Sequence, residues 1–260
     1  MDSIVTKDQS RPELATVRRF EAAGFRAWPA GTVHYDGTWV LRLTHGHPAK
    51  RLNSVNPLDP GDVNNLDERI QRAAQRFNAF GRPLIFRLSP LSGEAISRRL
   101  DAEGWQTTGH SIVMRLALDD DAVHGALDQI PMKDMARFIA ASIATQGAEP
   151  ALGQGLLEVI GAIQPEAGLF VLEGDAEPLA TAICVHDGDL AGLFEVATGA
   201  AERGKGFGRR IVLSALKWAR LRGARTAWLQ VEAGNEAALR LYASLGFTEA
   251  YRYHYRIPKA

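Results

Sequence analysis

Helical and strand-like patterns of apolar residues alternate along the second half of the chain. Residues 132–145 and 151–163 carry apolar side chains at helical spacing, and the runs that follow are short and apolar. Gly174-Asp175 and Asp187-Gly188 separate these runs, and such pairs are typical of turns in an antiparallel meander. The predicted order is two helices, three strands, a helix, a strand and a helix. These elements cover residues 132–145, 151–163, 169–172, 179–185, 190–196, 209–222, 226–231 and 236–245.

The first half of the chain shows the same kinds of pattern less clearly. Its periodicity predicts helices over residues 13–27 and 67–80 and strands over residues 38–44 and 110–118. Residues 57–65 are rich in Pro, Asn, Asp and Gly, which predicts a loop.

The two halves match each other when one is offset by 142 residues, which places residue 81 on residue 223. Residues 81–105 then lie over residues 223–247 without a gap, and the order of helices, glycines and strands agrees. The residues that meet identical partners are Gly81, Glu94, Ala95, Arg98 and Gly104. We therefore predict two copies of one α/β unit, one over residues 1–118 and one over residues 119–260.

Composition restricts the class of protein. The chain has 260 residues, of which 46% are hydrophobic, which predicts one large domain or two modest ones with an adequate core. Thirty basic residues balance thirty acidic ones, so we expect no general attraction to nucleic acid or to a membrane. No apolar run is long enough to span a bilayer and residues 1–8 carry no export signal, so we expect a cytoplasmic protein. The predicted fold class is α+β, with a mixed, mainly antiparallel sheet flanked by helices.

Metal and disulfide chemistry are not expected. The chain has one cysteine, which excludes an intrachain disulfide and a Cys-based zinc site. Cys184 falls in an apolar strand and is expected to be a small buried hydrophobe. His45 and His47 form the tightest histidine pair but have no evident third ligand, so we predict no metal site.

A glycine-rich segment at residues 203–208 joins the strand region to the helix over residues 209–222. Its glycines let backbone N–H groups approach an anion, and the start of a helix favours negative charge. Residues 203–225 contain eight Lys or Arg and no Asp or Glu, which suits a multiply charged ligand. A plain glycine-rich turn explains the glycines alone equally well. A dinucleotide fingerprint is disfavoured because the third glycine comes one residue early, and the P-loop pattern is absent.

Two motifs give the chain a resemblance to the GNAT superfamily of acyl-CoA-dependent N-acyltransferases. Residues 203–208 match the family signature [RQ]-x-x-G-x-[GA] between a strand and a helix, and residues 235–247 match N-x(6)-Y-x(3)-G-F. The resemblance covers about residues 130–257. The first half looks like a degenerate copy, as in tandem-repeat members, so the resemblance implies two tandem GNAT-like modules.

The resemblance implies transfer of an acetyl group from acetyl-CoA to an amine of a small molecule or a protein, without a metal. Loop N–H groups would bind the diphosphate, and the strand over residues 196–198 would bind the acyl carbonyl and the pantetheine arm. Direct attack by the amine is favoured, since no nucleophile-elbow motif is present. The residues implied in cofactor binding are Val196, Ala197, Thr198, Arg203, Gly204, Lys205, Gly206, Phe207, Gly208, Arg209 and Asn235.

Tyr242 is the candidate general acid. Asn235 and Tyr242 are seven residues apart, so they lie on one stripe of the predicted helix. The family pattern places this tyrosine hydroxyl near the thioester sulfur and the asparagine near the pantetheine. The structural alternatives are that Tyr242 is a half-buried residue whose hydroxyl reaches solvent and that Asn235 caps the helix. Asn235 can both cap the helix and contact the pantetheine.

Glu195 is the candidate general base, because an alkylamine is mostly protonated at neutral pH and its proton must be accepted. Strand alternation predicts Glu195 and Ala197 on one face and Phe194 and Val196 on the other. A solvated strand glutamate is an equally good explanation, and His186 at a turn is a weaker candidate.

The first copy lacks these features. The offset places residues 203–208 on residues 61–66, Tyr242 on Leu100 and Asn235 on Gly93. We therefore expect the first module not to bind coenzyme A in this way, but to pack on the second module and help to form the acceptor cleft. Candidates for that wall, which could equally be core and loop residues, are Trp39, Arg42, Arg51, Asn53 and Asn56.

Two other functions stay open at this point. One is a non-catalytic acyl-CoA-binding or regulatory module, and the other is a nicotinamide dinucleotide enzyme. The sequence does not indicate the acceptor, the length of the acyl group or the oligomeric state.

Overall fold

The computed structural model describes residues 12–259 of the chain. Its helices are α1 (Leu14–Ala27), α2 (Leu66–Ala79), α3 (Gly93–Ala102), α4 (Met135–Gln146), α5 (Leu152–Gly161), α6 (Phe207–Leu221) and α7 (Glu236–Ser244). Its strands are β1 (Thr32–Asp36), β2 (Trp39–Leu43), β3 (Ser54–Pro57), β4 (Phe86–Leu88), β5 (Gln106–Ala117), β6 (Glu166–Glu173), β7 (Pro178–Asp187), β8 (Leu190–Thr198), β9 (Thr226–Glu232) and β10 (Thr248–Ile257). Short 3-10 turns lie at Lys50–Leu52 and Ala200–Glu202.

All ten strands form one continuous sheet in the order β1-β2-β3-β4-β10-β5-β9-β8-β7-β6. Neighbouring strands are antiparallel except for β3 with β4 and β8 with β9, which are parallel. The same parallel pair thus recurs in each half, as a tandem arrangement requires. The α+β class with a mainly antiparallel sheet is confirmed.

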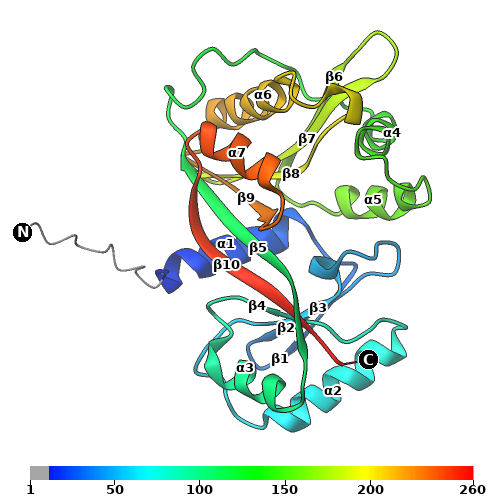
Figure 1. Ribbon diagram of the computed structural model, residues 1–260, viewed down its shortest axis with the longest axis vertical. Helices are drawn as coiled ribbons and strands as arrows, with labels where there is room; N and C mark the ends of the chain where they lie inside the picture. Colours follow the sequence, from blue (N-terminus) through cyan, green and yellow to red (C-terminus); the bar gives the residue numbers. More distant parts are fainter. Residues whose placement is uncertain (1–11, 260) are drawn as a thin grey trace, which may run out of the picture.

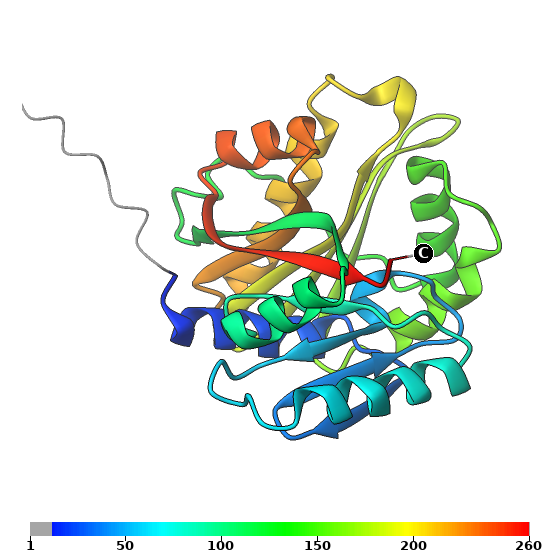
Figure 2. The same cartoon turned by 60° about the horizontal axis from the view of Figure 1, so that its bottom comes forward.

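The two halves exchange their last strands. β5 ends the first half but pairs with β9 of the second, whereas β10 ends the second half and pairs with β4 of the first. β5 and β10 also pair with each other, and Figure 1 shows them side by side between the two lobes. In Figure 2 the red β10 again crosses the middle of the protein next to the green β5. The predicted boundary near residue 118 falls directly after β5, and the division into two modules stays a prediction.

Three apolar clusters hold helices against the sheet. In the second half, α6 packs on one face of the strands through Ile211, Ala215 and neighbouring residues. The other face is covered by α4, α5 and also α1, which the first half contributes through Val17 and Phe20. A separate cluster packs α2 and α3 on the strands of the first half around Phe86. The junction between the halves therefore belongs to the core.

The predicted helices and strands of the second half are confirmed, with ends that differ by a few residues. In the first half α1, α2, β2 and β5 are confirmed, and the offset of 142 residues places β4 and α3 on β9 and α7. Sequence analysis missed β1 and β3, and β3 extends into the start of the predicted loop. No helix in the stretch from 12 to 259 is long and apolar enough to cross a membrane.

Candidate functional site

A gap opens between β8 and β9, and the candidate residues gather around it. The two parallel strands pair only from Leu190 with Thr226 to Leu193 with Leu229. Beyond this point β9 stays paired with β5 and β8 stays paired with β7. The edge of β8 that faces β9 is therefore free to bind a ligand with its backbone groups.

A bulge marks the start of the gap. The pairing of β7 with β8 shifts between Ile183–Phe194 and Thr181–Ala197, and Glu195 adopts a left-handed φ of 48°. Because the bulge adds a residue on β8, side chains no longer alternate strictly between the faces. Phe194 belongs to the cluster with α1 and α4, whereas Val196 packs on the cluster with α6. The predicted alternation, which put Phe194 and Val196 on one face, is therefore wrong.

Residues 196–198 form the free edge of β8. Val196, Ala197 and Thr198 are half-buried, and Ala197 and Thr198 pair with Thr181 and Ala180 of β7 on the other edge. The bulge thus leaves their remaining backbone groups aimed at the gap, which is the arrangement that a ligand with an amide chain requires.

The glycine-rich loop lies at the end of this edge and starts α6. Gly204 and Gly206 have φ values of 78° and 88°, a conformation that glycine adopts without strain. Gly206 is the N-cap of α6, and no side chain caps the helix there. Within residues 12–259, the backbone N–H groups of residues 204–209 donate to no protein acceptor. These donors at a helix N-terminus form an exposed site for an anion.

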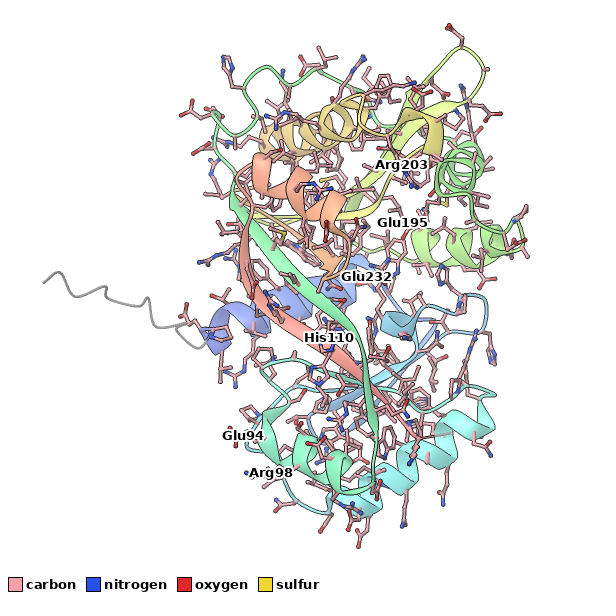
Figure 3. All side chains as sticks on the ribbon, in the orientation of Figure 1. Glu94, Arg98, His110, Glu195, Arg203 and Glu232 are labelled. Carbon is pink, nitrogen blue, oxygen red and sulfur yellow. The ribbon has the colours of Figure 1, made fainter. Side chains whose placement is uncertain are left out.

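Three elements converge beside the loop. A methyl group on Gly208 would lie 3.1 Å from Thr198 Oγ1 and 3.4 Å from Leu241 Cδ2, so the ends of β8, α6 and α7 are in contact. Arg209 donates from Nη1 to the carbonyl and hydroxyl oxygens of Ser244, at 3.3 and 3.2 Å. Lys205 pairs with Glu202 at 3.1 Å, while Arg203 is exposed. Figure 3 labels Arg203 and Glu195 in the same module.

Tyr242 lies on α7, as predicted, and Asn235 precedes the first residue of this helix. Asn235 is the N-cap, and its Oδ1 accepts the N–H of Ala238 at 3.1 Å, while its amide nitrogen has no partner among residues 12–259. Tyr242 is 6% exposed and packs edge-on against Phe247 at 5.7 Å between ring centroids. Burial raises the pKa of Tyr242 to about 12, so its phenol carries a proton at neutral pH.

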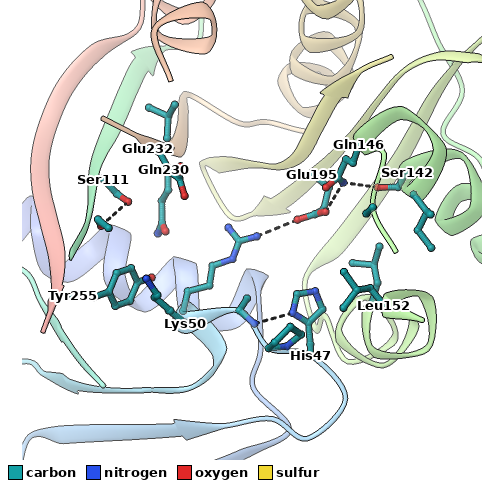
Figure 4. A pocket seen from close by; sticks show the side chains of 18 of the residues that line it. His47, Lys50, Ser111, Ser142, Gln146, Leu152, Glu195, Gln230, Glu232 and Tyr255 are labelled. Atoms are coloured by element: carbon teal, nitrogen blue, oxygen red, sulfur yellow. Dashed lines mark hydrogen bonds and ion pairs between the residues drawn. The ribbon is translucent and has the colours of Figure 1, made fainter. Parts of the chain in front are cut away.

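A cavity of about 570 Å³ lies on the other side of β8, where the two halves meet. Figure 4 shows that its walls come from both halves. The first half contributes residues 47–51 together with Gly109 and Ser111, and the second half contributes α4, α5, β9 and β10. Polar side chains that line it are His47, Lys50, Arg51, Ser111, Ser142, Gln146, Glu195, Gln230, Glu232, Tyr253 and Tyr255.

Glu195 projects into this cavity and is held from both halves. Its Oε1 accepts from Nη2 of Arg51 at 3.1 Å, and its Oε2 accepts from Nε2 of Gln146 at 2.8 Å. Gln146 is itself fixed by a hydrogen bond to the hydroxyl of Ser142 at 2.9 Å. Figure 4 draws these contacts as dashed lines at Glu195. The carboxylate therefore has a defined orientation, and the Glu195 side chain is 15% exposed.

Glu195 and the loop face different spaces. Neither Tyr242 nor residues 203–209 line the cavity of Glu195, and the diverging end of β8 lies between them. This division suits a reaction in which one ligand enters along the loop and the other through the cavity. His186 pairs with Ala191 near the β7–β8 turn, beyond the bulge from these groups.

Sequence analysis suggested five residues of the first half for the cavity wall. Of these, Arg51 lines the cavity and the other four do not. Trp39 is buried among the apolar residues of the first half. Arg42 is buried and donates to the carbonyl oxygens of Trp28 and Arg51. Asn53 and Asn56 are buried and bond to nearby backbone oxygens.

Sequence analysis missed most of the cavity. Gln146, Lys50, Ser111 and Glu232 come from separate segments, and β10 adds Tyr253 and Tyr255. No local motif joins these residues, because they come together only through the packing of the two halves.

The first-half counterpart of the glycine loop is filled by an acidic side chain. Asp62 Oδ2 accepts the backbone N–H and the hydroxyl of Thr38 at 2.9 and 2.7 Å. Its Oδ1 accepts from Arg69 at 2.8 Å. A carboxylate in this place would repel a diphosphate.

The histidines and the cysteine have structural surroundings. His45 stacks on Phe80 at 3.7 Å, and Nδ1 of His47 accepts the N–H of Ala49 at 3.2 Å. Burial raises the pKa of the Cys184 thiol far above its usual range. In the part of the chain that the structure describes, no group of three or more His, Cys, Asp or Glu could hold a metal.

Comparisons with known proteins agree with this geometry. The family described as "Probable histone acetyltransferase Rv0428c C-terminal" matches residues 14–256. The "Uncharacterized N-acetyltransferase YobR" of Bacillus subtilis is 26% identical over 253 residues, which are 94% of this chain and 99% of that protein.

Two solved structures share the fold. A GCN5-related N-acetyltransferase from Kribbella flavida has a TM-score of 0.69 and 20% identity, covering 96% of this chain and 98% of that one. A tandem GNAT protein from the clavulanic acid biosynthesis pathway has a TM-score of 0.62 and 14% identity, covering 95% and 90%. Both extend over the two halves.

Proposed function

The chain belongs to the family described as "Probable histone acetyltransferase Rv0428c C-terminal" and is a tandem GNAT N-acetyltransferase, and from this we propose how its site works. The second module, residues 119–260, transfers an acetyl group from acetyl-CoA to an amine. The first module, residues 1–118, binds no cofactor and completes the acceptor cavity. The reaction proceeds by direct attack of the amine, with both ligands bound together.

One observation carries this proposal: the unpaired N–H groups of residues 204–209 lie at the end of the gap between β8 and β9. The N–H groups bind the diphosphate of coenzyme A, with the positive charge of Arg203 and Arg209 nearby. Val196, Ala197 and Thr198 bind the pantetheine arm, and the free amide nitrogen of Asn235 reaches it from α7. The residues present therefore fit the cofactor.

Tyr242 acts as the general acid. Its phenol is protonated, because burial raises its pKa to about 12, and it lies on the helix that packs beside the loop. The bound cofactor supplies a thioester, whose thiol leaves when the amine is acylated. Proton donation by Tyr242 lets that thiol leave uncharged, and general acid catalysis of this kind contributes about 10²- to 10⁴-fold in rate.

Glu195 acts as the general base. Its carboxylate faces the cavity, while the free edge of β8 one residue further on faces the cofactor gap. A substrate amine in the cavity would thus meet a carboxylate that can accept its proton. Since Arg51 and Gln146 occupy one site on each carboxylate oxygen, each oxygen keeps a lone pair for the amine.

A non-catalytic acyl-CoA-binding module is the second candidate. The same loop supports it, but it gives no reason for a polar cavity that is formed by both halves around Glu195. Turnover distinguishes the two. A nicotinamide enzyme has no such support, since antiparallel hairpins rather than a βαβ unit precede the loop.

Two measurements on the full chain test the proposal. In a thermal shift experiment, acetyl-CoA should raise the melting temperature and NAD should not, since a ligand at about 100 times its Kd stabilises by about 2.7 kcal/mol. Release of free thiol is then followed with a polyamine, an amino acid, an aminoglycoside and a lysine-containing peptide. Cys184 is fully buried and should not disturb this assay. Stabilisation by NAD alone would reject the assignment, and binding without turnover of any amine would favour the second candidate.

A further inference from the structure

We propose that Arg51 is a positioning residue that the first module supplies to the reaction of the second, holding the Glu195 carboxylate turned into the cavity. This inference rests on the proposed role of Glu195 as the general base. It gives the degenerate module a chemical part in the reaction in addition to a structural one.

The contact between the two residues is direct. Nη2 of Arg51 lies 3.1 Å from Oε1 of Glu195, and the two residues are 144 positions apart in the chain. The Arg51 side chain is 27% exposed and that of Glu195 is 15% exposed. A partly buried ion pair of this kind is screened by solvent much less than one on the surface.

Arg51 is itself held in place by aromatic rings and by a buried arginine. Its guanidinium carbon lies 4.7 Å from the ring centre of Trp28 and 5.8 Å from that of Phe194. The two rings stack at 5.3 Å with an angle of 4° between their planes. Arg42 donates to the backbone oxygens of Trp28 and Arg51, which fixes both residues. The cation thus has little freedom to leave the carboxylate.

The other charged and titratable groups around Glu195 do not replace this contact. Lys50 and His47 come from the segment before β3, Glu232 comes from β9, and β10 contributes two tyrosines, Tyr253 and Tyr255. The facing residues of α4, Ser142 and Gln146, are uncharged. Burial lowers the pKa of His47, which Glu195 opposes, so this histidine is neutral at neutral pH. Within residues 12–259, Arg51 is the cation that forms an ion pair with Glu195.

The pair matters for a base because it fixes the direction of the carboxylate. A carboxylate that can rotate away loses its alignment with the amine, and a displacement of about 1 Å can cost about 10²-fold in rate. Arg51 would therefore act on kcat and not on the binding of acetyl-CoA.

The first experiment follows the Glu195 carboxylate at neutral pH without any acceptor. The full chain is labelled with ¹³C in the glutamate carboxyl groups, and Glu195→Gln assigns the signal. Arg51→Gln should move this carboxyl signal, because the carboxylate loses the guanidinium that holds it at 3.1 Å, and Arg51→Lys should move it less. The matched control is Arg98→Gln, which removes an exposed arginine paired with Glu94 in the other lobe (Figure 3) and should leave the signal in place. An identical Glu195 signal in Arg51→Gln and the unchanged protein would overturn the inference.

The second experiment uses the amine with the fastest thiol release in the panel. Arg51→Gln should lower kcat by about 10- to 100-fold and leave the Kd for acetyl-CoA unchanged. Thermal unfolding shows whether the variant is folded, and Arg51→Lys, which keeps the charge, should recover part of the loss. Glu195→Gln separates the two proposals. Full activity in Glu195→Gln would reject Glu195 as the base, whereas a slow Glu195→Gln together with an unchanged kcat in Arg51→Gln would reject only the role of Arg51.

Discussion

Glu21 of α1 and Arg87 of β4 form a buried bidentate ion pair where the two halves meet. The side chains are 2% and 4% exposed, and Nη2 of Arg87 lies 2.9 Å from Oε1 of Glu21. Tyr251 of β10 donates its hydroxyl proton to the same oxygen at 2.7 Å. Burial alone would lower the pKa of Arg87, but the charge of Glu21 raises it well above its usual value. One carboxylate thus connects three elements from both ends of the chain.

We predict that Glu21→Gln destabilises the protein by about 3–5 kcal/mol, because it leaves the buried guanidinium without a counter-charge. Urea unfolding followed by fluorescence measures the free energy of unfolding. The double variant Glu21→Gln with Arg87→Met should lose less than Glu21→Gln alone, since no unpaired charge then remains. A double variant that loses the sum of both single effects would show that the pair is not coupled.

The loop prediction concerns Gly206, where φ is 88° and where an added methyl group would meet no atom within 4 Å. Gly206→Val should weaken acetyl-CoA binding by at least about tenfold, or about 1.4 kcal/mol, because a β-branched residue strains this backbone and covers the N–H groups. Isothermal titration calorimetry measures the Kd.

Gly223 offers a matched control at the other end of α6. Its φ is 102°, and it too has no atom within 4 Å of an added methyl group. Gly223→Val should therefore introduce similar strain and lower stability, yet leave the Kd for acetyl-CoA unchanged. Equal loss of affinity in both variants would mean that the loop binds no diphosphate.

For Tyr242 we predict a loss of turnover without a loss of binding. Tyr242→Phe removes the phenol proton but keeps the packing against Phe247. The kcat should fall by about 10²- to 10⁴-fold, the range of general acid catalysis, while the Kd for acetyl-CoA stays the same. Tyr35→Phe, at a tyrosine that is 75% exposed on β1, is the control and should keep full activity. Unchanged turnover in Tyr242→Phe would reject Tyr242 as the acid.

The local patterns of the chain were enough to predict most of the fold. Apolar periodicity and turn glycines placed the helices and strands of the second half, and the offset of 142 residues located α3 and β4 in the first. β1 was missed because its residues are mostly exposed and lack a clear alternation. The exchange of β5 with β10 left no trace in the sequence, since either strand could pair with β4 or β9.

In the candidate site too, residues in local motifs could be predicted and residues brought together by packing could not. Motifs with fixed spacing placed Gly206, Asn235 and Tyr242 on the elements where the structure has them. The predicted sheet face of Phe194 relative to Val196 was wrong, because the prediction assumed strict alternation and a bulge in β8 interrupts it. Gln146 gave no signal, because its contact with Glu195 depends on how α4 docks on β8. The approach of Arg51 to Glu195 likewise depends on how the halves pack, and no spacing rule describes that.

Asp62 gives a prediction for acid stability. Its hydrogen bonds from Arg69 and Thr38 lower its pKa from 3.8 to about 2, although partial burial opposes this. A carboxyl group with a lowered pKa in the folded state stabilises above its ordinary pKa, and this contribution is lost as the pH falls from about 4 to about 2. Asp62→Asn should therefore lose stability at pH 7 and show a flatter decline below pH 4.

Urea midpoints between pH 7 and pH 2 measure this effect. Asp59→Asn in the same loop is the control, because among residues 12–259 that carboxylate accepts a single hydrogen bond, from the N–H of Gly61 at 2.9 Å. An Asp62→Asn curve parallel to that of the unchanged protein would contradict the prediction.

The exchange of strands predicts that residues 119–260 do not form a stable module alone. Without residues 1–118, β9 loses its partner β5, and Phe194 and Trp228 lose their packing on Trp28 and Phe20 of the α1 region. In the fragment β10 could pair with β9 in place of β5 and so complete the sheet. The rings of Phe194 and Trp228 would still be exposed to solvent. The fragment should show no cooperative thermal unfolding by near-UV circular dichroism, whereas the full chain should show one transition. A fragment that unfolds cooperatively and binds acetyl-CoA would mean that α1 and β5 are dispensable for the second module.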